Sequence, residues 1–349
     1  MRWLLAIAPL LIISCDSASS GVGQSASSSV RSLYNGSTGN MIVNADGFLA
    51  SAPEILYPEQ FDVYIEREVE AISNVHPDQY HGFREIFRAN GQGDFLLNVI
   101  ERRLAGNSGY SPASSELHIT YQDQQRYMVK YRDLHLGVQN GLSANFRWKE
   151  DPALKQMAGL DCILYSAESK HGLGDVDLYV DANTGMLLGY TYYDNVGEIT
   201  LKLETTLVEL SPTHPAVTWS SSLVDEEYYN PGANNIELDF DLSEPSYLPP
   251  GFYKRSARVL DSFDLFPGMG NTHVALYSDG IHQLFVAQHS YDEPTTVGAS
   301  VLQTTITTAR FSEAGGIRMV EGNPPHKRVY VVGQMPRDEI HTVFSSIFY

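Results

Sequence analysis

The chain has 349 residues, of which 43% are hydrophobic, and this is enough for two domains with substantial cores. Its net charge of −19 argues against nucleic-acid binding, because an acidic surface repels the phosphate backbone. The basic pairs Lys254-Arg255 and Lys327-Arg328 are short, and such pairs are typical of solvated surfaces.

The first residues have the pattern of an export signal. Arg2 gives a positive start, and the apolar run Leu4–Ile13 is too short to span a bilayer but suits a secretory signal. The run leads into Ile12-Ile13-Ser14-Cys15, which resembles a bacterial lipobox. Residues 1–15 are therefore predicted to be a lipoprotein signal peptide with Cys15 lipidated, and multiple acyl chains would anchor the protein stably. The alternative is an ordinary signal peptide with an incidental cysteine.

The residues after Cys15 are predicted to tether the protein to a membrane. Under the best-known lipoprotein sorting rule, Asp16 would retain the protein at the inner membrane, which favours a periplasmic, lipid-anchored location. Residues 16–54 are predicted to be a flexible tether, because Asp16–Asn40 is rich in Ser and Gly and cannot bury enough apolar surface to fold. About 25 such residues have a reach on the order of 25–30 Å.

The next part of the chain begins with strand patterns. Apolar and polar residues alternate from Phe61 to Ile65, which predicts a half-buried strand. Glu66–Ile72 fits a strand or a helix. Phe83–Ala89 and Asp94–Glu101 flank Asn90-Gly91, and Asn-Gly between such runs predicts a hairpin.

Further strands and turns follow up to residue 212. Gln122–Arg132 leaves strand and helix open, and Asp151-Pro152 predicts a turn. Four later segments read as strands: Met157–Tyr165, Val176–Asp181, Met186–Tyr193 and Glu198–Leu210. Turns at Asn183-Thr184-Gly185 and Asp194–Gly197 join the last three, so residues 55–212 are predicted to form one domain built on a β-meander.

A proline-rich, acidic segment, Ser211–Pro231, marks a domain boundary. We place a linker at 213–234 and a second domain at 235–349. In the second domain, Thr272–Gln288 holds two apolar runs separated by Ser278-Asp279-Gly280, which predicts a hairpin with Gly280 at positive φ. The imperfect alternation of its second run suggests a strand that is covered on both faces for part of its length.

The end of the chain is predicted to contain strands and a helix. The strand segments are Thr304–Phe311, Ile317–Glu321 and Arg328–Gly333, with a Gly315-Gly316 turn. Pro336–Tyr349 has acidic residues in its first turn and apolar residues at helical spacing, which predicts a helix packed on the core.

Two blocks of the chain resemble one known family. The entry Leu248–Phe252 followed by the hairpin Tyr277–Gly280 resembles the C-terminal domain of the MucB/RseB family of periplasmic sigma-factor regulators. The stretch from Ala158 to Leu210 resembles the N-terminal domain of the same family, which is LolA-like. The resemblance implies an α+β fold: an N-terminal LolA-like open β-half-barrel with helices, and a smaller C-terminal α+β domain with an antiparallel sheet.

Catalytic and metal-binding signatures are weak. Asp175, Asp177 and Asp181 lack the glycine and glutamate that a calcium loop would need, and a solvated strand face explains them. The histidine pairs His76/His81 and His282/His289 do not have metal-ligand spacing. The loop Pro267–Gly270 lacks the Lys-Ser/Thr of a phosphate-binding loop, and Cys162 lies in an apolar run that predicts a small buried hydrophobe. We predict that the protein is not an enzyme and that it binds no cofactor and no metal.

The favoured hypothesis is a non-enzymatic envelope regulator. An open half-barrel would leave an apolar concavity suited to an acyl chain or an apolar peptide. The resemblance implies a sensor of envelope stress whose ligand alters contacts with a membrane anti-sigma factor. The alternative is a lipid or lipoprotein carrier of the LolA type, although a permanent lipid anchor argues against a shuttle. A secreted hydrolase is a third hypothesis with no supporting motif.

Overall fold

The structure is a computed structural model, and it describes residues 46–72, 81–103, 109–112, 136, 139–219, 221–222, 238, 240–260, 272–290, 301–303, 308–314, 317–324 and 327–348. Several predictions fall on other residues: those for Cys15, Asp16, Asp16–Asn40, Gln122–Arg132, His76, Pro267–Gly270 and Gly315-Gly316. Within the described ranges, no helix combines the length and apolar character needed to cross a bilayer.

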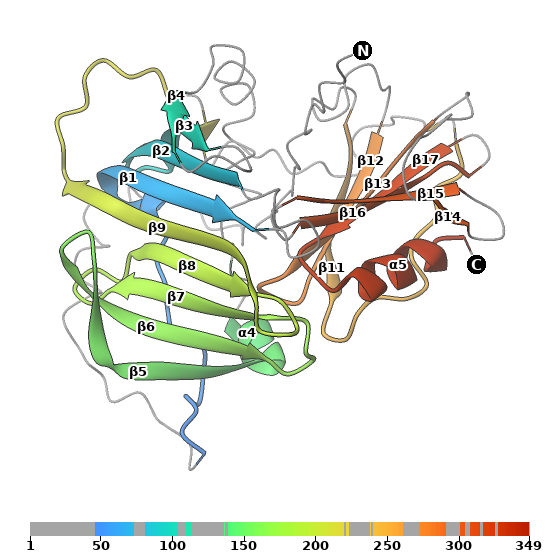
Figure 1. The fold of residues 1–349 in the computed structure, drawn as a ribbon, viewed down its shortest axis with the longest axis horizontal. Coiled ribbons are helices and arrows are strands. Elements are labelled where there is room, and N and C mark those ends of the chain that lie inside the picture. Colours follow the sequence, from blue (N-terminus) through green and yellow to red (C-terminus); the bar gives the residue numbers. More distant parts are fainter. Residues whose placement is uncertain are drawn as a thin grey trace, which may run out of the picture.

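The first of two antiparallel sheets contains ten strands in the order β10-β3-β2-β1-β9-β8-β7-β6-β5, with β4 also paired to β3. The bounds are β1 Asp62–Ala71, β2 His81–Asn90, β3 Asp94–Arg103, β4 Ser111–Pro112, β5 Phe146–Met157, β6 Leu160–Ser169, β7 Asp175–Asp181, β8 Leu187–Tyr193, β9 Ile199–Leu210 and β10 Ser221–Ser222. The two ends of this sheet do not pair, so the described strands form an open sheet and not a closed barrel (Figure 1).

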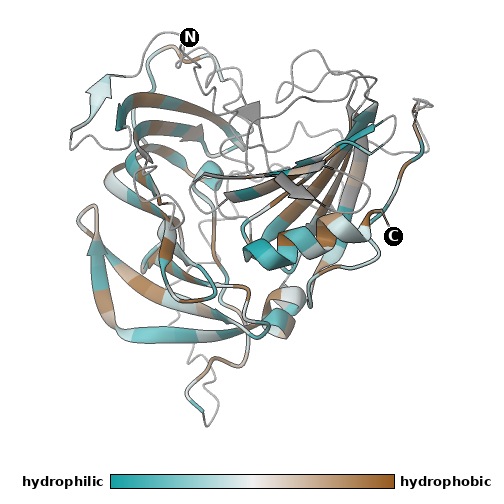
Figure 2. Cartoon of the chain, turned by 45° about the vertical axis from the view of Figure 1, so that its right-hand side comes forward, coloured by the Kyte–Doolittle hydropathy of each residue, from teal (hydrophilic) through white to brown (hydrophobic). Residues whose placement is uncertain are grey.

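The second sheet contains seven strands in the order β11-β12-β13-β17-β16-β15-β14. The bounds are β11 Tyr253–Leu260, β12 Thr272–Ser278, β13 Gln283–Ser290, β14 Val301–Gln303, β15 Thr308–Ala314, β16 Ile317–Gly322 and β17 Lys327–Gly333. Helix α5, Arg337–Ser346, packs on β16 and β17 through Ile340, Val343 and Phe344, as its apolar spacing predicted. Its hydrophilic side faces outward while apolar residues gather on the strands behind it (Figure 2).

The hairpin predicted in Thr272–Gln288 is confirmed, with β12 and β13 in register from Thr272↔His289 to Ser278↔Gln283. Nearly every residue of both strands is buried, so the expectation of cover on both faces also holds. The second strand begins at Gln283 and not at Ile281, because Asp279–His282 form a four-residue turn. Gly280 has a φ of +113° in this turn, as predicted.

The expected helices of the half-barrel are few among the described residues. Beside the first sheet these are the helix α4, Gln139–Asn145, and the 3₁₀ turn η1, Pro58–Gln60. The open alternative at Glu66–Ile72 resolves as strand through Ala71.

One turn prediction and one strand prediction near β5 are wrong. Asp151-Pro152 lies inside β5, where the register shifts between Asp151 and Lys155. Proline is tolerated there because β5 is an edge strand and the irregularity needs no backbone donor. The actual turn is Ala158-Gly159, with φ values of 50° and 78°, and it interrupts the segment predicted as the strand Met157–Tyr165.

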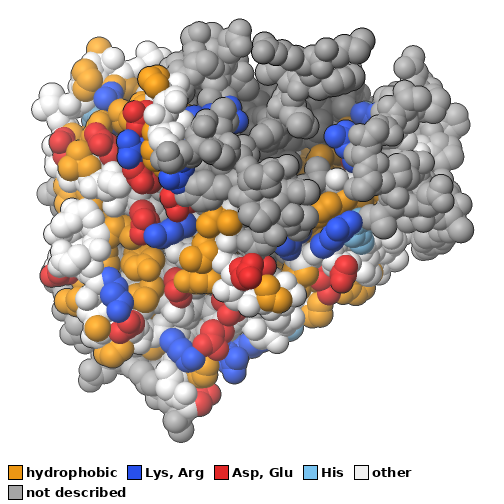
Figure 3. Space-filling view, viewed as in Figure 1, with side chains coloured by type: hydrophobic (Ala, Val, Ile, Leu, Met, Phe, Trp, Pro, Cys, Tyr) orange, Lys and Arg blue, Asp and Glu red, His pale blue; other side chains and the backbone are white. Residues whose placement is uncertain are grey.

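The outer surface of the first sheet carries ordered charge pairs. On β1, β2 and β3, the guanidinium of Arg84 bonds to both Glu68, at 2.7 Å, and Glu101, at 2.8 Å. Arg103 bonds to Glu70, and the Tyr110 ring lies under Arg84. Basic and acidic side chains are interspersed with apolar ones on the face in view (Figure 3). Exposed ion pairs of this kind contribute little to stability. They account for the charged side chains on these three strands.

Candidate functional site

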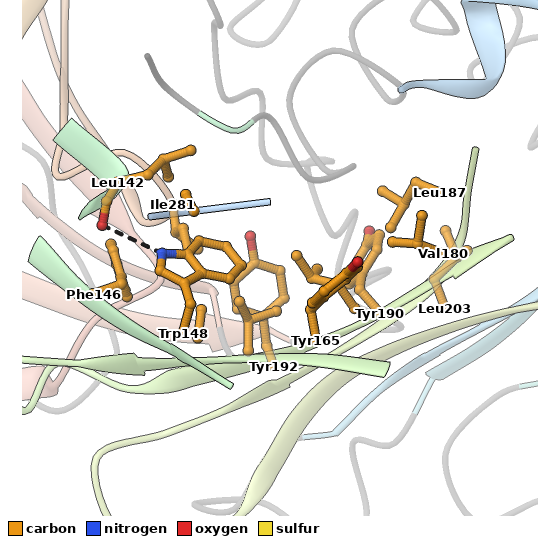
Figure 4. Packing of buried hydrophobic residues seen from close by; sticks show 14 of the residues in the cluster. Leu142, Phe146, Trp148, Tyr165, Val180, Leu187, Tyr190, Tyr192, Leu203 and Ile281 are labelled. Atoms are coloured by element: carbon orange, nitrogen blue, oxygen red, sulfur yellow. Dashed lines mark hydrogen bonds between the residues drawn. The ribbon is translucent and has the colours of Figure 1, made fainter. Parts of the chain in front are cut away.

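One apolar cluster lines the concave face of the first sheet, and we call this face the cradle. It is built from cross-strand neighbours, such as Tyr165 opposite Leu178 and Tyr190 opposite Leu203. The described members include Leu178 and Leu201. Figure 4 labels others: Phe146, Trp148, Tyr165, Val180, Leu187, Tyr190, Tyr192 and Leu203. Aromatic and branched side chains in this arrangement provide a surface for an apolar ligand.

Residues 46–60, which we call the strap, lie across this surface. The sequence placed residues 46–54 in the flexible tether, but here Leu49, Ala52 and Pro53 are buried, and Leu49 and Ala52 belong to the cradle cluster. Figure 1 shows the strap, in blue, crossing behind the strands of the first sheet. The described part of the cradle is therefore occupied by the protein itself.

A small cavity of about 20 Å³ remains where the strap meets β1, β8 and β9. This is room for about one water molecule, and not for an acyl chain. Arg67 lies at its wall, and its guanidinium bonds to the buried carboxylate of Glu85 at 3.0 Å. Removing one partner of a buried ion pair is costly, so this pair fixes β1 against β2 at the polar end of an otherwise apolar surface.

The turn of the β12–β13 hairpin is inserted into the same cradle, and we call residues Asp279–His282 the tip. Ile281 has no exposed surface and joins the cluster of Leu142 and Phe146 (Figure 4). The side chain of Asn145, at the end of α4, donates hydrogen bonds to the backbone oxygen of Asp279, at 2.7 Å, and to that of Gly251, at 3.2 Å. The tip thus joins the second sheet to the first through apolar and polar contacts.

The tip is held in one conformation by its own side chains. The Asp279 carboxylate accepts hydrogen bonds from the backbone N–H groups of Ile281, at 3.0 Å, and His282, at 2.8 Å. It also lies 2.9 Å from Nδ1 of His282, whose ring packs near Phe146 and Tyr192 at 5.7 and 6.3 Å between centroids. A buried carboxylate that accepts several hydrogen bonds is well satisfied, so the interaction of Asp279 with His282 stabilises the tip.

The other candidate residues have structural environments. Burial raises the pKa of Cys162 to about 11, which suits the predicted buried hydrophobe and not a nucleophile. Asp181 is buried and accepts hydrogen bonds from Thr184 in the β7–β8 turn, so it is not on a solvated face as expected. Asp177 accepts a hydrogen bond from Tyr193, whose pKa is raised first by burial and then by this carboxylate.

The structure does not bring the remaining histidine candidates together as ligands. His282 lies in the tip and His289 in β13. No group of three or more His, Cys, Asp or Glu side chains has metal-binding geometry in the part of the chain that the structure describes.

Sequence reasoning missed the strap and the insertion of the tip. The available signals were the apolar residues in Phe48-Leu49 and Ile55-Leu56-Tyr57, which stand at the end of a polar segment. Ile281 was a second signal, because an apolar residue within a tight turn needs a partner outside its own hairpin.

No family model and no curated protein matches the chain by sequence. Among solved structures, it is similar to MucB in complex with MucA(peri), with 15% identity, a TM-score of 0.48, and 82% of this chain and 91% of that chain covered. The MucA/MucB complex of Pseudomonas aeruginosa gives 14% identity, a TM-score of 0.49 and coverages of 82% and 93%. A putative outer membrane lipoprotein-sorting protein domain from Vibrio parahaemolyticus gives 10% identity and a TM-score of 0.19, with 46% of this chain and 89% of that chain covered. All three TM-scores lie below 0.5.

Proposed function

We propose that the protein is a non-enzymatic regulator of the cell envelope, which binds an apolar ligand in its cradle and modulates a membrane anti-sigma factor. The observation that carries the proposal is the burial of the tip residue Ile281 in the cradle cluster. One continuous core contains both the ligand-facing surface and a contact with the second sheet. A change in the cradle would therefore alter the contacts that hold the tip of the second sheet. A sensor needs such a connection between its ligand site and its partner site.

The class of partner comes from the resemblance of Leu248–Phe252 and Tyr277–Gly280 to the MucB/RseB family. Leu248 and Phe252 pack against the core of the second sheet, and Gly251 receives the hydrogen bond from Asn145. The residues that carry the resemblance thus lie at the junction of the two sheets, where a partner would be sensitive to the state of the cradle.

We propose that Cys15 carries the lipid anchor and that Asp16 keeps the protein at the inner membrane. Metabolic labelling with a fatty-acid analogue should mark the wild type and not Cys15→Ala. Equal labelling of both proteins would exclude the anchor without affecting the proposed role of the cradle.

The regulatory role can be tested by chemical crosslinking of intact membranes, purification of the protein, and mass spectrometry of bound proteins and lipids. We expect a single-span anti-sigma factor with the wild type, and its loss with Ile281→Asp, which places a charge in the buried junction. Leu154→Asp is the matched control, because Leu154 is 58% exposed and does not belong to the cradle cluster that holds Ile281. Recovery of lipids or lipoproteins without an anti-sigma factor would instead support a LolA-type carrier.

A further inference from the structure

The cradle binds the strap through main-chain hydrogen bonds. The backbone N–H of Leu49 donates to the carbonyl of Trp148 at 2.7 Å, and that of Leu56 donates to the carbonyl of Gly185 at 2.9 Å. In return, Leu187 donates its N–H to the carbonyl of Leu56 at 2.8 Å. These groups match an extended polypeptide, whereas an acyl chain has no donor or acceptor along its length and would leave them unsatisfied.

The side chains of the strap divide between the cradle and solvent. Leu49 and Ala52 are buried in the cluster, while Ala50 and Ser51 between them are exposed. Just before them, the ring of Phe48 lies beside the cations of Arg147, at 4.9 Å, and Lys149, at 4.5 Å. Arg147 and Lys149 are exposed and alternate along β5 with the cradle residues Phe146 and Trp148, so the Phe48 ring lies on the other side of this edge strand. The cradle itself therefore receives the small or branched apolar residues Leu49 and Ala52.

The strap is attached to the first sheet less extensively than a strand is. It pairs with other segments only through isolated bridges, at Leu49 and Leu56 among the described residues, and it crosses the strands instead of extending the sheet. A segment with few backbone bonds opens at lower free energy than the strands beneath it. It also lies outside the strands, before β1 in the chain, so it can leave the cradle without disrupting the order of the strands.

We propose that the cradle is a binding site for an extended apolar peptide, and that the strap is a built-in occupant which such a peptide displaces. This inference rests on the proposed ligand-binding role of the cradle and names the ligand class. While the strap is docked, the apparent affinity for an added peptide is reduced in proportion to the small fraction of open cradle.

The test uses the full chain with a site-specific protease sequence inserted after Gln60, purified in its folded state and then cut. The probe is a fluorescent synthetic peptide of residues 46–60, and binding is measured by anisotropy. We expect the peptide to bind the cut protein at least about tenfold more tightly than the uncut protein. A peptide with Leu49→Asp should bind about tenfold more weakly, and one with Ala50→Asp should bind normally.

A second pair of variants keeps the test independent of the inserted site. In the uncut chain, Leu49→Asp should loosen the strap and increase binding of the wild-type peptide, whereas the exposed control Ala50→Asp should not. Near-ultraviolet circular dichroism, which reports the packing of Trp148, establishes that each protein is folded.

Three results would overturn the inference. Failure of the peptide to bind a cut protein that remains folded, or loss of the native spectrum on cutting, would show that the strap is a permanent part of the core. Binding of a fluorescent fatty acid in place of the peptide would exclude the peptide class but would leave the proposed regulatory function intact. Failure to capture an anti-sigma factor would count against the proposed regulatory function and leave this inference intact, because peptide exchange does not depend on that partner.

Discussion

Gly280 lies in the tip at a place where the tip packs against α4. Its φ of +113° is a conformation that side-chain-bearing residues rarely adopt. A Cβ atom at this position would lie 3.1 Å from Cδ2 of Leu142 and 3.5 Å from the backbone nitrogen of Leu142. Gly280→Val would therefore both strain the turn and press against α4.

The two costs can be separated with a matched glycine. Backbone strain alone costs about 1–3 kcal/mol. Overpacking against Leu142 adds about 1–3 kcal/mol, so we expect a total of about 2–6 kcal/mol for Gly280→Val. Gly197 also has positive φ, +83°, but beyond its chain neighbours no atom lies within 4 Å of the place that a Cβ would take there. Gly197→Val should therefore show only the cost of strain.

The assay is chemical unfolding of the full chain, followed by tryptophan fluorescence. Trp148 is a suitable reporter because its indole N–H donates to the carbonyl of Leu142, 3.5 Å away. We expect Gly280→Val to unfold at clearly lower denaturant concentration than Gly197→Val. Equal destabilisation of the two variants would refute the contact between the tip and α4 as an energetic feature.

Three further predictions concern single side chains. Asn145→Ala should destabilise the junction by about 1–3 kcal/mol, measured by calorimetry, because the buried carbonyl of Asp279 loses its donor and the partly buried hydrogen bond to Gly251 is lost as well. Burial lowers the pKa of His273 to about 4, so the unfolded chain binds a proton between pH 6.5 and 4 that the folded chain does not. Unfolding titrations should therefore show stability falling as the pH is lowered across this window, by up to about 3 kcal/mol, with a smaller slope for His273→Gln. Cys162, with its pKa of about 11, should react with a thiol reagent at pH 8 only after unfolding.

Local signals predicted much of the strand order correctly. The Asn90-Gly91 and Asp279-Gly280 hairpins and the meander from β7 to β9 follow from alternation and turn residues, because these features act over a few neighbouring residues. The error at Asp151-Pro152 has a physical reason as well. A proline that would end a central strand is accepted on an edge, and the sequence does not show which strand lies at the edge.

The site was less predictable because it depends on contacts distant in the sequence. Leu49 lies in a segment whose composition predicts a tether, and only the cradle, about 100 residues later, provides its partners. The apolar concavity itself was expected, but its occupant was not. Likewise, Asp-Gly predicted the turn of the hairpin, whereas the burial of Ile281 depends on the position of α4.

The strap and the tip are parts of the same cluster, and this gives the two proposals a common physical basis. Leu49 bonds to the backbone of Trp148, the indole of Trp148 donates to Leu142, and Leu142 packs in one cluster with Ile281. When a peptide replaces the strap, the contacts of Trp148 change, and the packing contacts of Ile281 change with them. If the sites are coupled, the effect must be reciprocal, so Gly280→Val should also alter the affinity of the cradle for the strap peptide. Unchanged peptide affinity in a folded Gly280→Val protein would show that the shared cluster is a passive core, and the signal to a partner would then have to leave the cradle by another route.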